Sequence, residues 1–259
     1  MQIEKVVEQK GGMFKIVMDN GDSFKAHEES LVRYRLMKGT ELDEAEYERI
    51  MQAIQYDQAY VEALKYISYK LRSISEMHQY LSEDYGPEVI SETIHRLKDE
   101  GYLNDNHYAV ALKNTMLNTS DKGPGSLVRE LKKHQVDQDI IMRMADAFDS
   151  EIDRERMNRI KARELKKHRG AYRQFRMKLQ EKLYQKGYNQ DHMDMITFDD
   201  DEFDETSHFE KDFEKYYNKH MKKDGSYASR QKLVQALMGR GYNYDMIQKK
   251  LGGIDDEFI

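Results

Sequence analysis

The chain of 259 residues contains no cysteine and only two prolines. Without cysteine it can form neither a disulfide framework nor a thiolate metal site, so neither an oxidising compartment nor zinc-ribbon chemistry is expected. No apolar run approaches the roughly 18 residues of a membrane span, and the first ten residues lack the apolar segment of a signal peptide. These absences predict a cytoplasmic protein that makes no contact with a membrane.

The composition favours helix. Lys, Glu, Leu, Met and Gln are abundant, and these residues together with the scarcity of proline predict helices over most of the length. Hydrophobic residues make up 39% of the chain and charged residues 35%. Because so few apolar residues must serve so long a chain, they are expected to be spread over an elongated molecule.

Charge is distributed in blocks, although the net charge is only -6. Residues 154–186 hold thirteen Lys or Arg against three Glu, a local balance of +10. Residues 199–214 hold nine acids against one Lys, and residues 215–250 hold nine basic residues against two Asp. This pattern indicates a polyanionic or charge-patterned partner, or else solvated helix faces on either side of an acidic linker.

The first thirty residues depart from the helical pattern. Phe14, Ile16 and Met18 alternate with other residues, and residues 19–22 contain the Asn-Gly pair of a tight hairpin turn. Two or three short strands are predicted here, packed on a following helix because so small a sheet is not stable alone. A second helix is predicted to begin at Thr40.

An internal repeat is the most informative feature of the sequence. Four segments share an apolar residue, three others, a leucine, three others and then a helix stop. The second leucines are Leu81, Leu131, Leu183 and Leu237. Their even spacing of 50, 52 and 54 residues predicts four related units with buried leucines at equivalent sites.

Helix start signals divide each unit into three helices. Ser73 and Glu76 form a capping box, and Pro87 and Pro124 stand where a helix begins. Asn189 follows a glycine by two residues, where the last helix of its unit needs an N-cap. A unit of this size buries little by itself, so its core must be completed by stacking on its neighbours.

The predicted fold class is all-α, with tandem three-helix repeats forming an elongated curved solenoid and a small N-terminal β-hairpin element. The predicted parts are a hairpin with helices over 1–56, three-helix repeats over 57–104, 105–150 and 151–200, an acidic linker over 201–208, and a fourth three-helix repeat over 209–259.

The sequence between about 57 and 150 resembles the RecX family of regulatory proteins. The residues that carry the resemblance are Arg72-Ser73-Ile74-Ser75-Glu76-Met77, Leu81, Ile94, Leu97, Gly101-Tyr102-Leu103-Asn104-Asp105, Tyr108-Ala109, Lys122-Gly123-Pro124 and Glu130-Leu131. From 151 to 256 the likeness rests on the repeat frame alone. Two departures stand out: Gln135 replaces a glycine that the family usually has, and the fourth repeat at 209–259 exceeds the three of short members.

The resemblance implies a function. RecX proteins bind the RecA nucleoprotein filament, limit its growth and lower its recombinase, ATPase and co-protease activities. Repeat units in a curved array offer a long surface that bridges several protomers of such a filament, and basic faces suit DNA phosphate or acidic protein surface. We therefore expect a monomeric negative regulator with RecA filaments as its partner and DNA as a further contact.

No pattern of catalysis or cofactor binding is present in the sequence. The nine histidines are scattered singly, with no His-Glu-x-x-His and no second ligand at metal spacing. The run of acids from Asp199 to Asp204 does not place carboxylates around one point, which a divalent cation would require. We predict no enzyme activity, no metal and no cofactor; a metal-dependent nuclease, the enzymatic alternative, would need convergent acids or histidines.

Arginine spacing guides the choice of a binding face. Four cations of the third repeat recur at helical spacing, and three more lie outside the apolar stripe of the next helix. Arginine also forms bidentate contacts with phosphate and carboxylate. The predicted partner-binding residues are Arg156, Arg159, Arg163, Lys167, Arg173, Arg176 and Lys178, with Arg230, Lys232 and Arg240 in the fourth repeat.

Two alternatives remain open at this point. The basic helices would equally serve a stand-alone, sequence-nonspecific DNA-binding protein, although the negative net charge counts against it. The cations would otherwise only keep the protein in solution. The acidic segment 199–214 is predicted to be a mobile linker or to cover the basic face, in which case Asp199, Asp200 and Asp201 would weaken partner binding.

Overall fold

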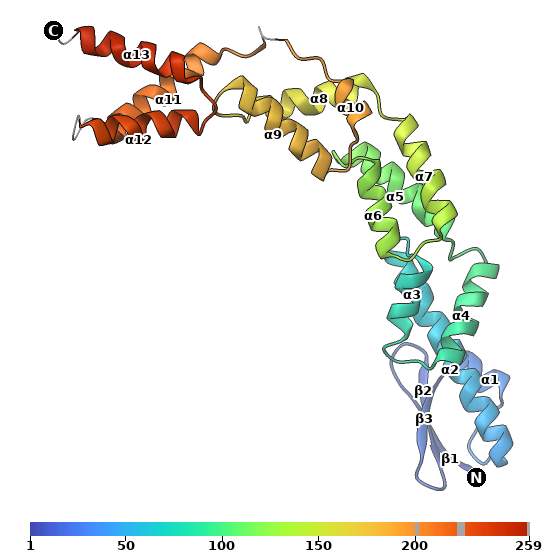
Figure 1. Cartoon of the computed structure of the whole chain (residues 1–259). Helices are drawn as coiled ribbons and strands as arrows, with labels where there is room; N and C mark the ends of the chain where they lie inside the picture. Colours follow the sequence, from blue (N-terminus) through green and yellow to red (C-terminus); the bar gives the residue numbers. More distant parts are fainter. Residues whose placement is uncertain (200–201, 222–225, 258–259) are drawn as a thin grey trace. The chain divides into compact units, whose positions relative to one another are not determined.

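A computed structural model describes residues 1–199, 202–221 and 226–257 (Figure 1). It begins with an antiparallel sheet in the order β1-β2-β3, made of β1 (Ile3–Glu8), β2 (Met13–Met18) and β3 (Ser23–His27). The predicted Asn-Gly turn joins β2 to β3, where Gly21 has a φ of 88° and the Asn20 side chain accepts a hydrogen bond from the Asp22 amide at 3.0 Å. The predicted N-terminal strands are confirmed.

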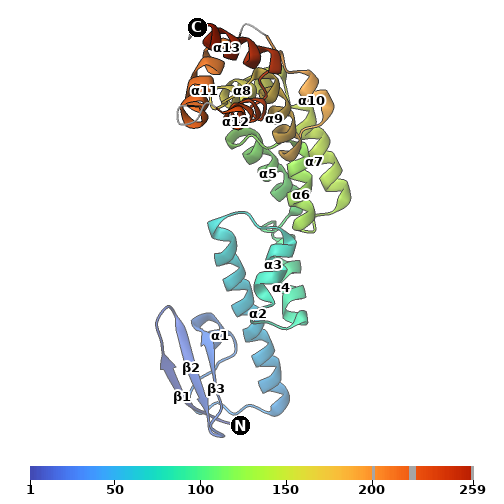
Figure 2. The same ribbon diagram turned by 60° about the vertical axis from the view of Figure 1, so that its left-hand side comes forward.

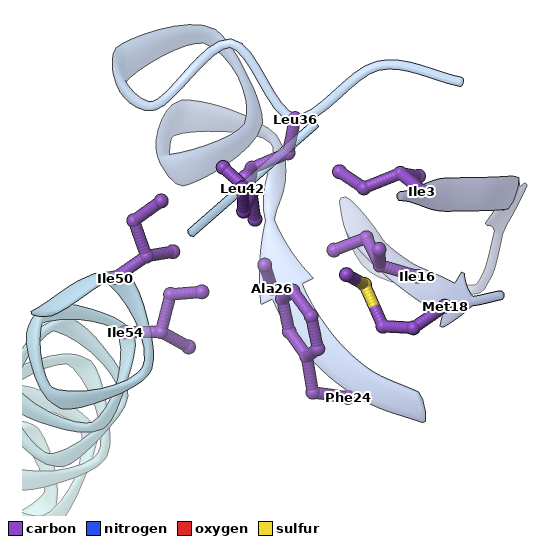
Figure 3. Close-up of a cluster of buried hydrophobic side chains, with 9 residues drawn as sticks. All are labelled: Ile3, Ile16, Met18, Phe24, Ala26, Leu36, Leu42, Ile50 and Ile54. Atoms are coloured by element: carbon purple, nitrogen blue, oxygen red, sulfur yellow. The ribbon is translucent and has the colours of Figure 1, made fainter. Parts of the chain in front are cut away.

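One face of this sheet is buried against α1 (Glu28–Arg33), α2 (Glu44–Tyr69) and the segment between them. Alternate residues of the strands point to this face, as the period of a β-strand requires. Figure 3 shows the resulting cluster, whose members are Ile3, Ile16, Met18, Phe24, Ala26, Leu36, Leu42, Ile50 and Ile54.

Helix α2 begins at a different residue from the one predicted. Its N-cap is Asp43, not Thr40, because the Asp43 carboxylate accepts from the Glu46 amide at 2.7 Å while the Glu46 side chain accepts from the Asp43 amide. The helix then runs for 26 residues across the predicted boundary between 1–56 and 57–104. It therefore packs on the sheet with one half and on α3 and α4 with the other (Figure 2).

The rest of the described chain is helical, and three-helix units recur in it. Residues 57–69 of α2 form the first unit with α3 (Ile74–Leu81) and α4 (Pro87–Asp99). The others are α5 (Asp105–Thr119), α6 (Pro124–Lys133) and α7 (Gln138–Ser150); α8 (Arg154–Leu165), α9 (Tyr172–Gln185) and α10 (Gln190–Asp194); and α11 (Glu205–His220), α12 (Tyr227–Met238) and α13 (Tyr244–Glu257). The all-α repeat class is confirmed, while the curved shape stays a prediction.

The equivalent leucines of the repeat frame are buried in every unit. Leu81 and Leu183 are 1% exposed, and Leu131 and Leu237 are fully buried. The predicted helix start signals are also confirmed. Ser73 and Glu76 form their capping box, and Asn189 caps α10 by accepting from the His192 amide. Helices α4 and α6 begin at Pro87 and Pro124. The sequence register of the units is therefore correct.

The middle helices α6, α9 and α12 end in the same way. Gln135, Gly187 and Gly241, each four residues after the buried leucine, have positive φ values of 54°, 87° and 92°. The next residue's amide then bonds back to that leucine's carbonyl, at 3.1, 3.0 and 3.3 Å respectively. This is a left-handed helix cap, which glycine adopts without strain and glutamine does not.

Consecutive middle helices meet end to end. At the start of α6 the amides of Gly123 and Gly125 donate to the carbonyls of Lys186 and Gly187 at the end of α9, at 2.8 and 2.9 Å. At the start of α9 the Ala171 amide donates to the Arg240 carbonyl at the end of α12, at 3.0 Å. Helix-terminal amides and carbonyls that lack partners within their own helices thus satisfy each other.

By its internal contacts the chain divides into two compact units, one of Met1–Leu112 with Glu130–Met142 and one of Lys113–Arg129 with Arg143–Ile259. The division passes through α5, α6 and α7 and so does not coincide with the repeats. The junctions of α6 with α9 and of α9 with α12 both lie within the second unit. The predicted domain boundaries stay a prediction. Helix α2 crosses the predicted boundary between residues 56 and 57, and α11 begins inside the predicted linker 201–208.

Candidate partner-binding surface

The third repeat presents cations because each of its two long helices buries an apolar stripe and leaves basic residues outside it. α8 buries Met157 and Ile160, and α9 buries Tyr172, Phe175, Leu179 and Leu183. The remaining positions of both helices are rich in Lys and Arg, and apart from the buried Arg156 and Lys161 these side chains extend to the surface with their charges in water. How these cations pair decides which of them a partner can reach.

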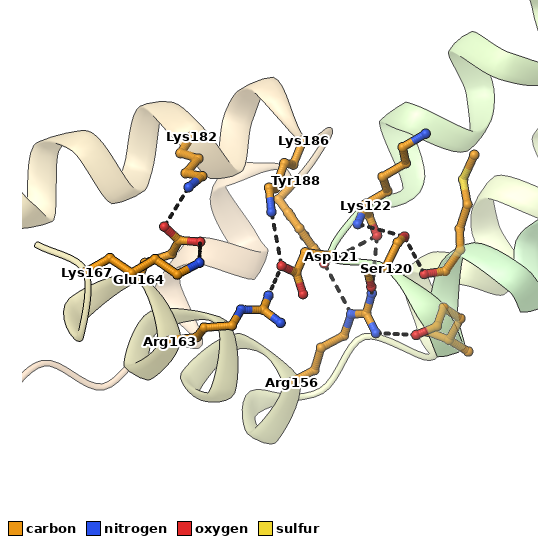
Figure 4. Close-up of polar contacts among 12 residues, drawn as sticks. Ser120, Asp121, Lys122, Arg156, Arg163, Glu164, Lys167, Lys182, Lys186 and Tyr188 are labelled. Atoms are coloured by element: carbon orange, nitrogen blue, oxygen red, sulfur yellow. Dashed lines mark hydrogen bonds and ion pairs between the residues drawn. The ribbon is translucent and has the colours of Figure 1, made fainter.

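Asp121, in the loop between α5 and α6, lies between two cations (Figure 4). Its carboxylate forms ion pairs with Arg163 of α8 and with Lys186, whose Nζ is 3.1 Å away at the end of α9. A loop of the second repeat therefore fixes the relative position of two cations of the third. Neither side chain is neutralised completely, because one carboxylate serves both.

Glu164 forms a second bridge of the same kind beside the first (Figure 4). Its carboxylate accepts from Lys182 at 2.6 Å and lies 4.0 Å from the Lys167 ammonium. Burial alone would raise the pKa of the Glu164 carboxyl, but the hydrogen bond from Lys182 and the nearby cations lower it below its usual value. Glu164 is therefore held in its charged form.

We name Arg163, Lys167, Lys182 and Lys186 the basic cluster. Its side chains are between 26% and 66% exposed, and its four charges face the two carboxylates of Asp121 and Glu164. Burial, and then the neighbouring cations, lower the pKa of Lys186 although Glu164 opposes the shift. The cluster has an excess of positive charge, and an incoming anion would relieve the repulsion.

Arg156 is not part of this surface, contrary to the prediction. It is 7% exposed, and its guanidinium donates to the carbonyls of Leu117, Ser120 and Lys122 and to the Tyr188 hydroxyl, at distances of 2.6 to 3.3 Å (Figure 4). The loop after α5 passes over the first turn of α8 and covers this position. Arg156 therefore anchors that loop and is not available to a partner.

The predicted residues of α9 lie on two different flanks of the helix. An α-helix turns by about 100° per residue, so Lys178 shares a flank with Lys182 and Lys186 of the basic cluster. Arg173 and Arg176 lie beyond the buried stripe on the other flank, where the Arg176 guanidinium lies 4.7 Å from the centre of the Phe198 ring. The structure thus separates residues that were predicted to form one face. Arg159 of α8 is exposed.

The predicted residues of the fourth repeat differ in their availability. Arg240 follows the C-cap of α12 and pairs with Asp212 at 3.1 Å and with the Tyr216 hydroxyl at 3.2 Å. Burial would lower the pKa of Arg240, and these two partners raise it. Lys232 is exposed and Arg230 is half-buried. Arg240 is thus engaged within its own repeat.

Sequence reasoning missed Lys182 and Lys186 as members of the basic cluster. Their spacing of four residues from each other and from Lys178 was the available signal, since it places them on one flank. The bridging role of Asp121 had no such signal, because this residue is more than forty positions away along the chain. Only the folded arrangement brings the loop of one repeat beside the helices of the next.

Within the acidic segment, Glu202 and Phe203 are docked on the third repeat. Glu202 binds Lys161 and the Tyr172 hydroxyl, and Phe203 is buried with its ring stacked 5.6 Å from that of Tyr172. α11 begins at Glu205, inside the range predicted for the linker 201–208. Glu202 pairs with buried Lys161 and not with the basic cluster, while Asp200 and Asp201 lie outside the described residues.

Over the described ranges no group of three His, Cys, Asp or Glu could hold a metal ion. No helix in the same ranges has the length and apolar character needed to cross a membrane. The Nε2 of buried His168 donates to the Ala171 carbonyl at 3.0 Å, and burial lowers the pKa of this histidine. His192, also buried, pairs with Asp149 at 3.2 Å. Both histidines have roles within the core.

Fold and surface together define a helical repeat protein with an exposed cluster of cations. Comparison with known proteins gives its family. Models of the RecX first three-helix domain and of the RecX third three-helix domain match residues 59–97 and 207–251. The regulatory protein RecX of Bacillus subtilis (strain 168) is 33% identical over 261 residues, covering 96% of this chain and 97% of the relative. The chain belongs to the RecX family.

Further relatives and solved structures that resemble this chain are also RecX proteins. The regulatory protein RecX of Staphylococcus haemolyticus (strain JCSC1435) is 31% identical over 99% of both chains. A crystal structure of a regulatory protein RecX superposes with a TM-score of 0.59 at 30% identity, covering 75% of this chain and 97% of that one. The structure of RecX from Lactobacillus salivarius gives 0.51 at 32% identity, covering 55% and 94%. The fourth repeat, which matches a family domain, thus falls within the family pattern.

Proposed function

We propose that this protein binds the RecA–DNA filament and limits its growth, and so lowers the recombinase, ATPase and co-protease activities of RecA. Membership of the RecX family is the observation that carries the proposal. The relatives are named regulatory proteins and not enzymes. We infer accordingly that the chain acts by binding, as a monomer in the cytoplasm and without a cofactor.

The basic cluster is the proposed contact. Arg163, Lys167, Lys182 and Lys186 sit on well-packed helices, and their positions relative to each other are fixed by Asp121 and Glu164. Such a preorganised group loses little side-chain entropy on binding. It offers four cations to acidic side chains of RecA or to the phosphates of the DNA within the filament, and Arg159 and Lys178 extend it.

Titration of this protein into RecA on single-stranded DNA, with ATP hydrolysis as the readout, tests the proposal. ATP hydrolysis should fall progressively as filaments are limited. A parallel titration with DNA alone, over a range of salt concentrations, distinguishes a protein that binds the RecA–DNA filament from one that uses its cations to bind DNA by itself. Tight binding to bare DNA with a steep salt slope, and no effect on RecA beyond competition for DNA, would favour the stand-alone DNA-binding protein instead.

A further inference from the structure

The N-terminal sheet buries one face and exposes the other. Paired residues of antiparallel strands share a face, so the strand register gives two adjacent rows of the exposed face. The residues of these rows are Val7, Lys15 and Lys25 in the first, and Lys5, Val17 and Ser23 in the second. The three lysines are exposed, and each strand contributes one. They form a line of cations across the sheet, which we name the sheet lysines.

The sheet lysines lack counter-ions within the protein. Their ammonium groups make no ion pair or hydrogen bond with another described residue. Of the acids on β1, Glu8 pairs with Phe14, in register with the buried face, and Glu4 occupies the irregularity between Ile3 and Lys5. The excess positive charge on the exposed face is therefore available to an anion.

Two of these lysines stand directly opposite each other, since Lys15 pairs with Lys25 in the register of β2 and β3. Like charges at paired positions destabilise a sheet, whereas opposite charges there stabilise it. The arrangement is thus unfavourable in the free protein and becomes favourable when an anion lies across both ammonium groups.

Lysines on a sheet also have a protective use, because charges on edge strands prevent sheets of separate molecules from pairing. That explanation fits Lys5 and Lys25, since β1 and β3 are the edge strands. It does not fit Lys15, which lies on the central strand β2. Protection of the edges therefore does not account for the whole line.

A pocket of about 350 Å³ continues the line past β3. Lys25 and His27 of β3 line it together with Lys65 of α2, which is held beside β3 where the Gln58 side chain donates to the Lys25 carbonyl at 2.9 Å. Lys65 is exposed, and its ammonium group likewise has no partner among the described residues. A fourth cation thus extends the line beyond the sheet.

The acids that line the same pocket are already engaged. Glu29 and Asp57 form ion pairs with Arg33, at 3.4 and 3.3 Å. The Tyr85 hydroxyl donates to the Glu62 carboxylate. These carboxylates therefore do not neutralise Lys25 or Lys65.

We propose that the exposed face of the N-terminal sheet binds the phosphate backbone of duplex nucleic acid. A duplex carries one charge for about every 1.7 Å of its axis, which suits a line of closely spaced cations. Lysine binds phosphate as a point charge. Because these contacts reach only the backbone, binding should show no sequence preference.

The other polyanions fit this face less well. Proteins bind single strands by stacking bases on aromatic side chains, and the two rows contain no Tyr, Phe or Trp. A membrane surface is bound through large apolar side chains, whereas the apolar residues here are the short Val7 and Val17. An acidic protein surface offers carboxylates at a lower density than the phosphates of a duplex.

This inference goes beyond the proposed function and does not rest on it. The sheet lysines and Lys65 belong to the first compact unit, whereas the basic cluster belongs to the second. Binding of bare duplex requires no RecA. Failure of the sheet to bind a duplex would therefore leave the inhibition of RecA through the basic cluster untouched, and the reverse also holds.

Fluorescence anisotropy of a short labelled duplex, titrated with the full chain without RecA over a series of salt concentrations, tests the proposal. Lys15→Gln with Lys25→Gln should lower the affinity about tenfold at low salt and make the slope of log affinity against log salt shallower by about 1.8, since each lost phosphate contact removes about 0.9. The matched control is Lys98→Gln with Lys132→Gln, which removes two exposed charges from α4 and α6 in the same unit. The control should keep the wild-type affinity and slope. An unchanged slope in the sheet variant, or equal effects of the two pairs, would overturn the proposal.

Other polyanions identify the partner class. The sheet substitutions should weaken binding of the duplex more than binding of a single strand of the same length. Poly-glutamate and vesicles of phosphatidylcholine with phosphatidylserine give the comparison with an acidic protein and with a membrane. The proposal is wrong if the sheet variant loses binding to the single strand, to poly-glutamate or to the vesicles while it keeps its affinity for the duplex.

Lys15→Glu separates binding from folding. The substitution places a carboxylate opposite Lys25, so a repulsive cross-strand pair becomes an attractive one and the melting temperature should rise. Duplex affinity should fall in the same variant, because a negative charge replaces a cation in the middle of the line. A lower melting temperature would contradict the like-charge pair, and wild-type affinity in the more stable variant would show that Lys15 takes no part in binding.

Discussion

The amide of Gly125 at the start of α6 donates a hydrogen bond to the carbonyl of Gly187 at the end of α9, at 2.9 Å. Each of these residues needs to be a glycine for a different reason. Gly187 has a φ of 87°, and a Cβ on it would lie 2.4 Å from the Ser126 nitrogen. A Cβ on Gly125 would lie 3.0 Å from the Gly187 oxygen. The contact between the second and third repeats thus depends on two backbones that approach without side chains.

Gly187→Ala should lower the free energy of unfolding by about 3 kcal/mol, since left-handed strain adds to a backbone clash at the junction. Gly101→Ala is the matched control. Gly101 also follows a helix with a positive φ of 78°, but a Cβ there meets nothing within 4 Å, so only about 1 kcal/mol should be lost. Urea denaturation measures both. Equal losses of unfolding free energy in the two variants would show that the close approach of the two backbones at Gly187 does not add to the cost of the substitution.

Gln135→Gly should raise the free energy of unfolding by about 1 kcal/mol, because the exposed Gln135 holds a left-handed φ of 54° that glycine adopts without strain. Gln180→Gly in the middle of α9 makes the same chemical change at a helical position. It should be destabilising by about 1 kcal/mol. Thermal unfolding of the two variants should therefore move in opposite directions, and a lower melting temperature for Gln135→Gly contradicts the cap.

Arg156→Met should lower the free energy of unfolding by about 3 kcal/mol, because three backbone carbonyls lose the donor that satisfies them. Arg159→Met, on the exposed side of the same helix, should change stability by less than about 0.5 kcal/mol. Denaturant midpoints of the two variants give the comparison. Similar, small effects for both would mean that Arg156 is a surface residue after all.

Acid should weaken the bridges around Glu164. Its carboxyl has a pKa below the usual 4.5 in the folded state, so the stability it contributes is present above pH 4.5 and is lost as pH falls through the folded-state pKa. Glu164→Gln should flatten the dependence of unfolding free energy on pH below 4.5. Glu155→Gln, an exposed change on α8, should retain the wild-type slope. The same slope in both variants would exclude a role for Glu164.

The repeat frame was predictable because a buried leucine and a helix stop leave a period in the sequence. Leu131 and Leu183 are buried as that period requires, and Pro124 and Asn189 stand where helices begin. The helix start at Thr40 was wrong because Asp43, three residues on, satisfies the same rule and is followed by Glu46. Capping signals that lie close together cannot be ranked without the packing of the helix they start.

The exposed basic surface of the third repeat was less predictable, since helical spacing identifies the face of a helix but not what covers that face. Arg156 shares its spacing with Arg159 and Arg163, yet a loop from the preceding repeat lies over it. Glycine spacing likewise could not show that Gly187 meets Gly125. Contacts between repeats join residues that are tens of positions apart, and no local pattern in the sequence records them.

The most direct measurement is inhibition of DNA-dependent ATP hydrolysis by RecA, compared between two charge-reversed variants. Lys182→Glu with Lys186→Glu reverses two cations of the basic cluster, and Arg173→Glu with Arg176→Glu reverses two on the other flank of the same helix. All four side chains lie at the surface, and circular dichroism should show both variants folded. The first variant should lose most of its inhibition and the second should keep it. If the first variant, correctly folded, inhibits RecA as well as the wild type does, the basic cluster is not the contact.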